Sequence, residues 1–319
     1  MSAFCSEPAA RLCLAVTAVL GGAVFYKLRN SPGQVGTRAI CLVGLWGGIG
    51  LLSSSLCWGL ALFCLSCLLT YVYLSGRELL PVGEKAVLIT GLWAVINNAG
   101  VLGFPVDGEL IPMTEYRQCM AVNFFGPVEI TKTFLPLLRK SKGRLVNISS
   151  MGAGVPMEKF AAYNSSKAAL TMFSAVMRQE LSKWGVKVIV IQPGPFKTNI
   201  VGTQEMWEKQ EKNLLAALDP DVLEDYGQEY ILVQGKYLRF SKDTWSMDYT
   251  PVFRDVLHAV SSKRPFALYT PGKISYLWLC FASFFPAEVF DYLNKKVHGS
   301  PDLPRAVSMT ACKDKVNFS

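Results

Sequence analysis

A tyrosine and a lysine separated by one helical turn carry the clearest chemical signal in this sequence. Tyr163 and Lys167 are spaced so that both side chains share one face of a helix. A phenol with the ordinary tyrosine pKa of about 10 is a poor base at neutral pH, and a nearby ammonium favours the phenolate and lowers that pKa. The pair therefore predicts general acid–base catalysis on a hydroxyl group.

The residues around Tyr163 distinguish it from two other tyrosines with the same spacing. Ser150 lies 13 residues before Tyr163 and follows a predicted strand, so a loop would present its hydroxyl to the phenol. The matching positions ahead of the other two tyrosines are Val256 and Leu279, which cannot donate a hydrogen bond. We expect those two pairs to be ordinary surface pairs: Tyr269/Lys273 and Tyr292/Lys296.

The elements that must position these residues follow an alternating pattern after Arg77. Short runs rich in β-branched residues predict strands at 86–89, 93–96, 144–148 and 186–191. They are apolar on both faces and separated by helix-length segments, which is typical of a parallel sheet covered on both sides. Residues 114–139 and 163–184 are expected to supply covering helices. The prediction is a doubly wound α/β fold.

The first quarter of the chain predicts a membrane anchor. Residues 39–76 form a run of 38 without one charged side chain, whereas a single span needs about 20 apolar residues. Residues 56–74 make the best span, and a further apolar stretch lies at 12–26. A signal peptide is the alternative for that first stretch, but a second, longer apolar run follows it. We expect one to three transmembrane segments.

Composition argues against several other classes of protein. The chain of 319 residues is 51% hydrophobic and 18% charged, below the usual charged share of about 25%, so extensive disorder is excluded. Its formal charge of +8 is scattered, and no nucleic-acid partner is expected. With two histidines and no second cysteine pair besides Cys64 and Cys67, no metal site is expected.

The motifs between residues 91 and 198 resemble the short-chain dehydrogenase/reductase family. Asn97-Asn98-Ala99-Gly100 is similar to its NNAG motif, and Pro193-Gly194 with Thr198 is similar to its nicotinamide-binding segment. The resemblance implies a Rossmann-like fold and a catalytic set of Asn123, Ser150, Tyr163 and Lys167. It implies the following cofactor-binding residues: Asn97, Ala99, Gly100, Tyr163, Lys167, Pro193, Gly194 and Thr198.

The resemblance also implies a role for each catalytic residue and a substrate. Tyr163 takes the hydroxyl proton, Lys167 lowers the tyrosine pKa and holds the nicotinamide ribose, Ser150 binds the substrate oxygen, and Asn123 holds a relay water. Residues 92–105 and 134–147 are most similar to membrane-bound members that oxidise steroid alcohols with NAD, such as estradiol to estrone or testosterone to androstenedione. Retinol is the alternative substrate and NADP the alternative cofactor.

For partners and location, the resemblance implies membrane lipid, a homodimer and the endoplasmic reticulum membrane. The dimer contact is expected through the helices at 114–139 and 163–184.

One segment departs from the family pattern. The phosphate loop T-G-x-x-x-G-x-G would begin at Thr90-Gly91, but Val95 and Asn97 stand where glycines belong. Thr90 and the NNAG motif are seven residues apart, where the fold places two βα units of about 30 residues each. About 60 residues are thus absent, with the helix N-terminus that receives the pyrophosphate. The alternative function is a non-catalytic membrane protein that pairs with a full-length partner.

The remaining chain completes the predicted organisation: an anchor at 1–76, a truncated dehydrogenase core at 77–200, and a substrate-side and C-terminal region at 201–319. Residues 274–290 are apolar enough to lie on a bilayer or to form a buried helix. Eight aromatic residues would either line a pocket for a flat substrate or pack a second small core: Trp207, Tyr226, Tyr230, Tyr237, Phe240, Trp245, Tyr249 and Phe253.

Overall fold

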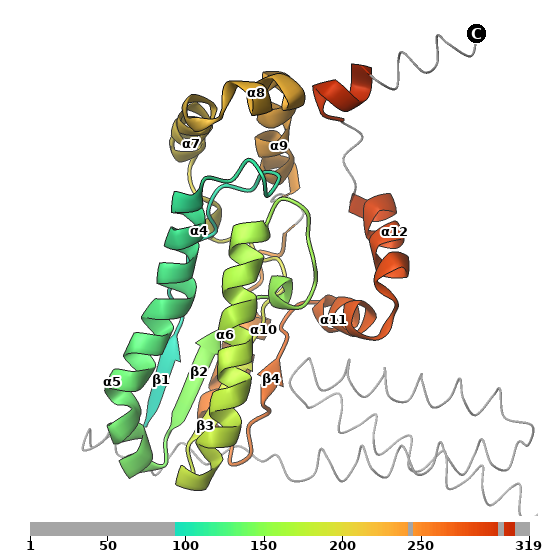
Figure 1. Cartoon of the computed structure of the whole chain (residues 1–319). Coiled ribbons are helices and arrows are strands. Elements are labelled where there is room, and N and C mark those ends of the chain that lie inside the picture. The colour runs from blue at the N-terminus through green and yellow to red at the C-terminus, as the bar shows by residue number, and fades with distance from the viewer. Residues whose placement is uncertain (1–92, 242–244, 299–302, 310–319) are drawn as a thin grey trace, which may run out of the picture.

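The computed structural model describes residues 93–241, 245–298 and 303–309 (Figure 1). The predicted anchor at 1–76, the predicted strand at 86–89 and the Thr90-Gly91 dipeptide lie outside these described residues. Within them, no helix has the length and apolar character needed to cross a membrane.

The described part of the chain contains a four-stranded parallel sheet in the order β1-β2-β3-β4. Its strands are β1 (Ala94–Asn97), β2 (Arg144–Ile148), β3 (Lys187–Ile191) and β4 (Leu268–Tyr269). The first three lie within one residue of their predicted bounds, and the predicted parallel α/β sheet is confirmed. Because β4 pairs with β3, part of the region 201–319 belongs to this core.

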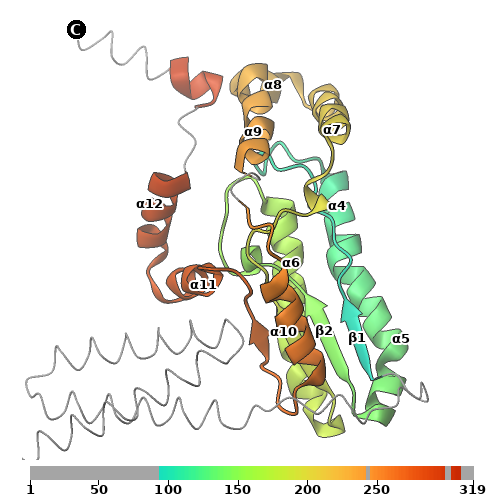
Figure 2. The ribbon, with the colours of Figure 1, turned by 180° about the vertical axis from the view of Figure 1, so that it is seen from behind.

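Helices cover both faces of the sheet. On one face lie α4 (Met113–Met120), a π-helical turn η1 (Ala121–Phe125), α5 (Gly126–Ser141) and α6 (Ala161–Glu180) (Figure 1). The opposite face is covered by α10 (Thr250–Ser261), as the view from behind shows (Figure 2). The helix predicted at 114–139 is interrupted by a wider π turn, a distortion that is frequent at functional sites.

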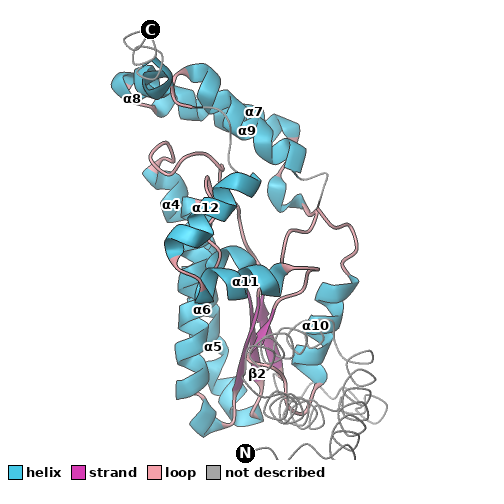
Figure 3. Cartoon of the chain, turned by 90° about the vertical axis from the view of Figure 1, so that its right-hand side faces the viewer, coloured by secondary structure: helices cyan, strands magenta, loops and turns pink. Residues whose placement is uncertain are grey.

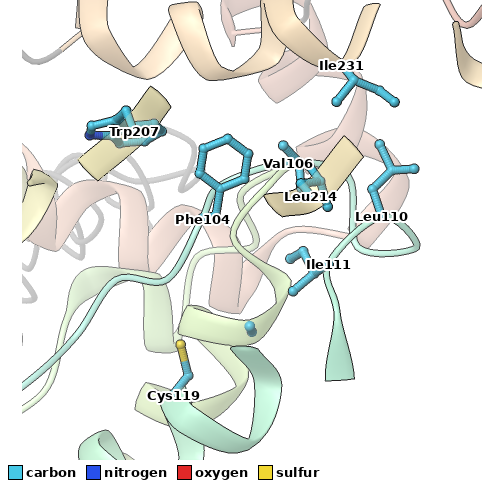
Figure 4. Close-up of a cluster of buried hydrophobic side chains, with 9 residues drawn as sticks. Phe104, Val106, Leu110, Ile111, Cys119, Trp207, Leu214 and Ile231 are labelled. Carbon is cyan, nitrogen blue, oxygen red and sulfur yellow. The ribbon is translucent and has the colours of Figure 1, made fainter. Parts of the chain in front are cut away.

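Three helices lie beyond the C-terminal ends of the strands: α7 (Gln204–Ala217), α8 (Pro220–Tyr226) and α9 (Gln228–Ser241) (Figure 1). Buried side chains from α7, α9 and the loop after β1 form one cluster, in which Phe104 and Trp207 have ring centroids 5.3 Å apart (Figure 4). Tyr226 and Trp245 pack against this cluster. For these aromatic residues the predicted second small core is confirmed, whereas Phe253 is 70% exposed.

The C-terminal part adds a pair of helices beside the core: α11 (Ser275–Phe284) and α12 (Ala287–His298) (Figure 3). Three short 3₁₀ turns lie in connecting segments: η2 (Met151–Ala153), η3 (Ser182–Trp184) and η4 (Asn199–Val201).

Two sequence predictions about exposure are wrong. The strand expected to be buried on both faces, β1, exposes Trp93 just before it and Ile96 within it, because it is the edge of the described sheet. The tyrosine expected on the surface, Tyr269, is fully buried, since it lies in β4. Its hydroxyl is 2.7 Å from His258 Nδ1 and accepts a hydrogen bond from the Phe266 backbone N–H.

Candidate active site

Asn97 belongs to a buried polar network beneath the site. Its Nδ2 donates to Asn147 Oδ1 at 2.8 Å across the paired strands β1 and β2, and Asn147 Nδ2 donates to Ser174 Oγ on α6 at 2.7 Å. All three side chains are buried, where an unbonded polar group is costly. The network therefore fixes β1, β2 and α6 in one register, and the predicted cofactor residue Asn97 contributes to it.

Asn123 anchors the backbone that follows the NNAG motif. It lies fully buried in the π turn, where its Oδ1 accepts from the Val101 N–H at 2.8 Å. Its Nδ2 donates to the Val101 carbonyl and to Ser166 Oγ, both at 2.9 Å. Asn123 thus joins the loop after β1 to helix α6.

Ser150 lies where the sequence predicts it, on the loop that follows β2. Its hydroxyl caps η2 by accepting from the Gly152 N–H at 3.2 Å. Gly152 lies so close to α6 that a Cβ placed there would be 2.3 Å from Asn164 Oδ1. This close approach holds the Ser150 loop against the first turn of α6, which also carries Tyr163.

Tyr163 and Lys167 are both on α6, and burial controls the pKa of each. Burial raises the pKa of Tyr163, while a hydrogen bond from the Ser150 side chain acts in the opposite direction. Lys167 Nζ donates to the Ile148 carbonyl at 2.9 Å and lies 5.9 Å from the Tyr163 ring centroid. Desolvation lowers the pKa of Lys167 to about 8. The pKa of Tyr163 is therefore raised above its ordinary value, and the lowering predicted from Lys167 is not observed.

Gly100 brings two of these side chains together. A Cβ at Gly100 would lie 3.2 Å from Lys167 Nζ and 3.3 Å from Asn123 Oδ1. The neighbouring Ala99 is exposed. The backbone after β1 therefore passes close to the lysine, so that a side chain at Gly100 would crowd both Lys167 and Asn123.

The segment after β3 is tied to the same loops. The Pro193 carbonyl accepts from the Met151 N–H at 3.0 Å, next to Ser150. The Gly194 N–H donates to the Pro271 carbonyl at 2.8 Å, and a Cβ at Gly194 would come within 2.1 Å of Ser275 Oγ. Thr198 is exposed and immediately precedes η4. The structure thus places Pro193 and Gly194 beside the Ser150 loop.

The described residues fit one end of a nicotinamide dinucleotide and not the other. At the nicotinamide end, Lys167 Nζ lies beside the side-chain-free Gly100. At the pyrophosphate end, the family pattern requires glycines in a loop, whereas Val95 and Asn97 are strand residues paired with Leu145 and Asn147. These positions cannot form a phosphate loop while they form β1.

Sequence reasoning missed several residues that position the site. Asn147 is a polar residue between the apolar residues Val146 and Ile148 of a buried strand, a signal that could have identified it. Ser166 lies three residues after Tyr163 on the same helix, and only its contact with Asn123 identifies its role. Nothing in the local sequence singles out Gly152, since the close approach to Asn164 is a tertiary contact.

Comparison with known proteins agrees with this geometry. The profile of the family described as short chain dehydrogenase matches residues 82–209. The chain is 49% identical to human 17-beta-hydroxysteroid dehydrogenase type 2, over 99% of this chain and 100% of that protein. It is 45% identical to estradiol 17-beta-dehydrogenase 2 of Rattus norvegicus, over 96% and 99% of the two chains. Human 11-beta-hydroxysteroid dehydrogenase type 2 is 43% identical over 58% of this chain and 45% of its own length.

The alignment with the human 17-beta relative also bears on the shortened segment. It runs over 387 positions against 319 residues in this chain, so at least 68 positions have no residue of this chain. That shortfall is close to the size of the block predicted to be absent. With these similarities along its whole length and its tyrosine, lysine and serine gathered beyond the strands, the chain belongs to the short-chain dehydrogenase/reductase family, whose members are oxidoreductases that act on CH–OH groups with NAD(P).

Proposed function

We propose that this site is built to oxidise the 17β-hydroxyl of a steroid, as in estradiol to estrone or testosterone to androstenedione, with NAD as the oxidant. The observation that carries the proposal is the joint placement of Ser150, Tyr163 and Lys167 on the η2 loop and the first turns of α6. The names of the relatives aligned over nearly the whole chain support the substrate class.

The roles of these residues are those that the family resemblance implies. Ser150 Oγ and the Tyr163 hydroxyl bind the substrate oxygen, and Tyr163 accepts the proton that the substrate hydroxyl loses. Because burial raises the pKa of Tyr163, its phenolate form, and with it the oxidation rate, increases as the pH rises. NAD, when bound, supplies the hydride acceptor, and Lys167, Gly100, Pro193 and Gly194 would border its nicotinamide end.

We further propose that this chain alone holds NAD weakly. Catalysis requires reacting atoms within about 3–3.5 Å of each other, and positioning of that kind draws on binding energy from remote parts of the cofactor. The strand positions of Val95 and Asn97 leave the pyrophosphate without its glycine loop.

A titration of the purified full-length chain in detergent with NADH tests the cofactor proposal, with nicotinamide fluorescence as the measurement. We expect no saturable binding in the micromolar range. The control is a chimera in which the missing block of the human relative is inserted between Ile89 and Leu92. It should bind NADH and oxidise estradiol, and competition between estradiol and retinol in the chimera tests the substrate. Saturable binding by the unmodified chain, or preference for retinol, would contradict the proposal.

A second candidate function, pairing with a full-length partner, is favoured by an exposed apolar surface on α5 and α6. These helices cover the same face of the sheet (Figure 1) and expose Ile130, Phe134 and Leu137 on one face of α5, and Met172 and Val176 on one face of α6. Exposed apolar patches of this kind mark protein interfaces. We propose a dimer through this surface.

Co-expression with the full-length human relative and affinity purification of one chain test the pairing. Recovery of both chains supports the dimer, and recovery should fall when Phe134 and Met172 are both replaced by Glu. Equal recovery with and without these substitutions would contradict it.

We also propose that residues 1–76 anchor the chain in the endoplasmic reticulum membrane, ahead of the core at 77–200 and the C-terminal region at 201–319. The uncharged run at 39–76 supports the anchor. Extraction of microsomes that contain the tagged chain with alkaline carbonate tests it, and the chain should stay with the membrane pellet. Release of the chain by alkaline carbonate would contradict the anchor.

A further inference from the structure

The helical pair α11–α12 exposes an apolar face that the catalytic machinery does not use. Helix α11 contains no charged residue, and it exposes Leu277 and Phe284 along one side, with Ile274 exposed at its N-cap. Phe284 is 81% exposed, which is the largest value among the large exposed apolar side chains of the described residues. The sequence of residues 274–290 is compatible with either a buried helix or a helix on a bilayer surface.

Helix α12 extends this face beyond the turn at Pro286. Phe285 in the turn is 52% exposed, and Val289 and Tyr292 lie one helical turn apart on α12 with exposures of 41% and 66%. We call these side chains the hairpin face: Ile274, Leu277, Phe284, Phe285, Val289 and Tyr292. Single exposed apolar residues are ordinary, whereas six large exposed aromatic and aliphatic side chains on one short helical pair indicate an interaction site.

The opposite side of the helical pair is packed, so the hairpin face is held in place. Phe290 on α12 is buried against Trp278 and Phe281 of α11, with ring centroids 6.1 Å and 5.7 Å away. Leu279 and Val155 are buried in the same cluster, which ties the pair to the loop after η2. The exposed aromatic residues therefore do not result from a loosely attached segment.

This packing brings the helical pair against both catalytic loops. A Cβ at Gly154 would lie 2.7 Å from the Leu279 side chain, and a Cβ at Gly194 would lie 2.1 Å from Ser275 Oγ. Gly154 is four residues after Ser150, and Gly194 follows Pro193 in the predicted nicotinamide-binding segment. The α11–α12 pair lies beside the core, next to the ends of the strands that carry these loops (Figure 3).

The charges around the hairpin face favour lipid acyl chains over a charged partner. Helix α12 carries Glu288 and Asp291, which balance Lys295 and Lys296 at its other end, and Lys273 precedes Ile274, so these described charges sum to only +1. Interfacial helices bury an apolar face about 5–10 Å into the boundary between headgroups and acyl chains, while lysine side chains reach back toward water. The uncharged run at 39–76 also predicts that this chain is attached to a bilayer.

We propose that the hairpin face inserts into the acyl boundary of a lipid bilayer and holds the Ser150 and Gly194 loops at the membrane surface. Insertion removes six apolar side chains from water without requiring anionic lipid. A steroid dissolved in the bilayer would then reach the site beside α11 and cross little water. This consequence, unlike the membrane contact, rests on the proposed function.

Photo-crosslinking in the full-length chain tests the contact separately from activity. Phe284 is replaced by p-benzoylphenylalanine, and the protein is reconstituted into vesicles of phosphatidylcholine with a tritiated acyl chain and irradiated. Phe253 provides the matched control, because it is also a phenylalanine, is 70% exposed and lies on α10. Since both side chains point into solvent, neither replacement disturbs the core.

We expect the variant with the photo-crosslinker at position 284 to carry at least about tenfold more radioactive lipid than the variant with it at position 253. High salt, which screens charge attraction, should not reduce this crosslinking. Lipid labelling that is equal at the two positions would overturn the proposal. Adducts at position 284 with a second copy or with another segment of the same chain, in place of lipid, would also overturn it. Estradiol turnover enters neither outcome, so failure of the proposed function leaves this test unaffected.

Discussion

The catalytic end of the molecule and the β1 edge of the sheet differ in how completely they are built. Around Ser150, Tyr163 and Lys167, each loop has contacts that fix it, including the Asn123 bonds to Val101 and the close packing at Gly152. At β1, by contrast, the strand pairs only with β2 among the described residues, and Ile96 is 45% exposed.

This difference shows that the two halves of a dehydrogenase site depend on separate segments of the chain. The catalytic side chains are held by contacts among β1–β3, α4–α6 and α11, and all of these elements are present. Pyrophosphate binding depends on a glycine loop, and Val95 and Asn97, which stand where two of its glycines belong, are strand residues of β1. Loss of one function therefore does not require loss of the fold around the other.

The largest expected effect comes from restoring the cofactor side. In the chimera that contains the missing block, Tyr163→Phe should lower turnover of estradiol about 100- to 10,000-fold, the usual contribution of a positioned acid–base group. NADH affinity should fall far less than turnover, because the phenol is only one of eight residues expected to contact the cofactor. Turnover within about twofold of the unsubstituted chimera would exclude Tyr163 as the base and show that the catalytic end is not organised as described.

A pH series sharpens the description of the catalytic end. Desolvation lowers the pKa of Lys167 from 10.5 to about 8 in the folded chain, so between these values the unfolded chain binds more protons. The stability of the wild type relative to Lys167→Met should therefore rise as the pH increases from about 8 to about 10.5, by up to about 3 kcal/mol. Unfolding midpoints in detergent measure this difference, and a constant difference across the window would show that Lys167 is solvated.

The network that joins the edge to the catalytic end can be broken at Asn147. Asn147→Ala leaves Asn97 Nδ2 and Ser174 Oγ without this partner, at a cost of about 1–3 kcal/mol for a buried polar group. Thr133→Ala on the exposed side of α5 is the control and should change stability by less than about 0.5 kcal/mol. Similar unfolding midpoints for the two variants would mean that the network does not stabilise the sheet.

The smallest effect concerns the edge itself. Ile96→Lys places a charge in the edge strand, and charged side chains at such edges oppose strand pairing between molecules. We expect slower aggregation by light scattering, with stability changed by less than about 0.5 kcal/mol. The matched control is Phe253→Lys on α10, away from any strand edge. An equal decrease in aggregation from both variants would attribute the effect to net charge.

The sequence by itself determined the local elements and the identity of the catalytic residues. Strands β2 and β3 follow from their apolar β-branched runs, and the spacing of Tyr163 and Lys167 follows from the helical repeat. The absence of loop glycines at positions 95 and 97 was also visible in the sequence. These are local properties, because periodicity and spacing act within a few residues.

Only the tertiary structure decided how these residues behave together. Tyr269 has the same spacing to a lysine as Tyr163 does, but β4 pairing buries it against His258. Burial raises the pKa of Tyr163 although Lys167 lies on the same helix, since desolvation depends on every element that surrounds the phenol. The apolar segment at 274–290 likewise forms a helical pair with one buried and one exposed side. Phe290 is buried in a cluster with Leu279 and Val155, whereas Phe284 is exposed.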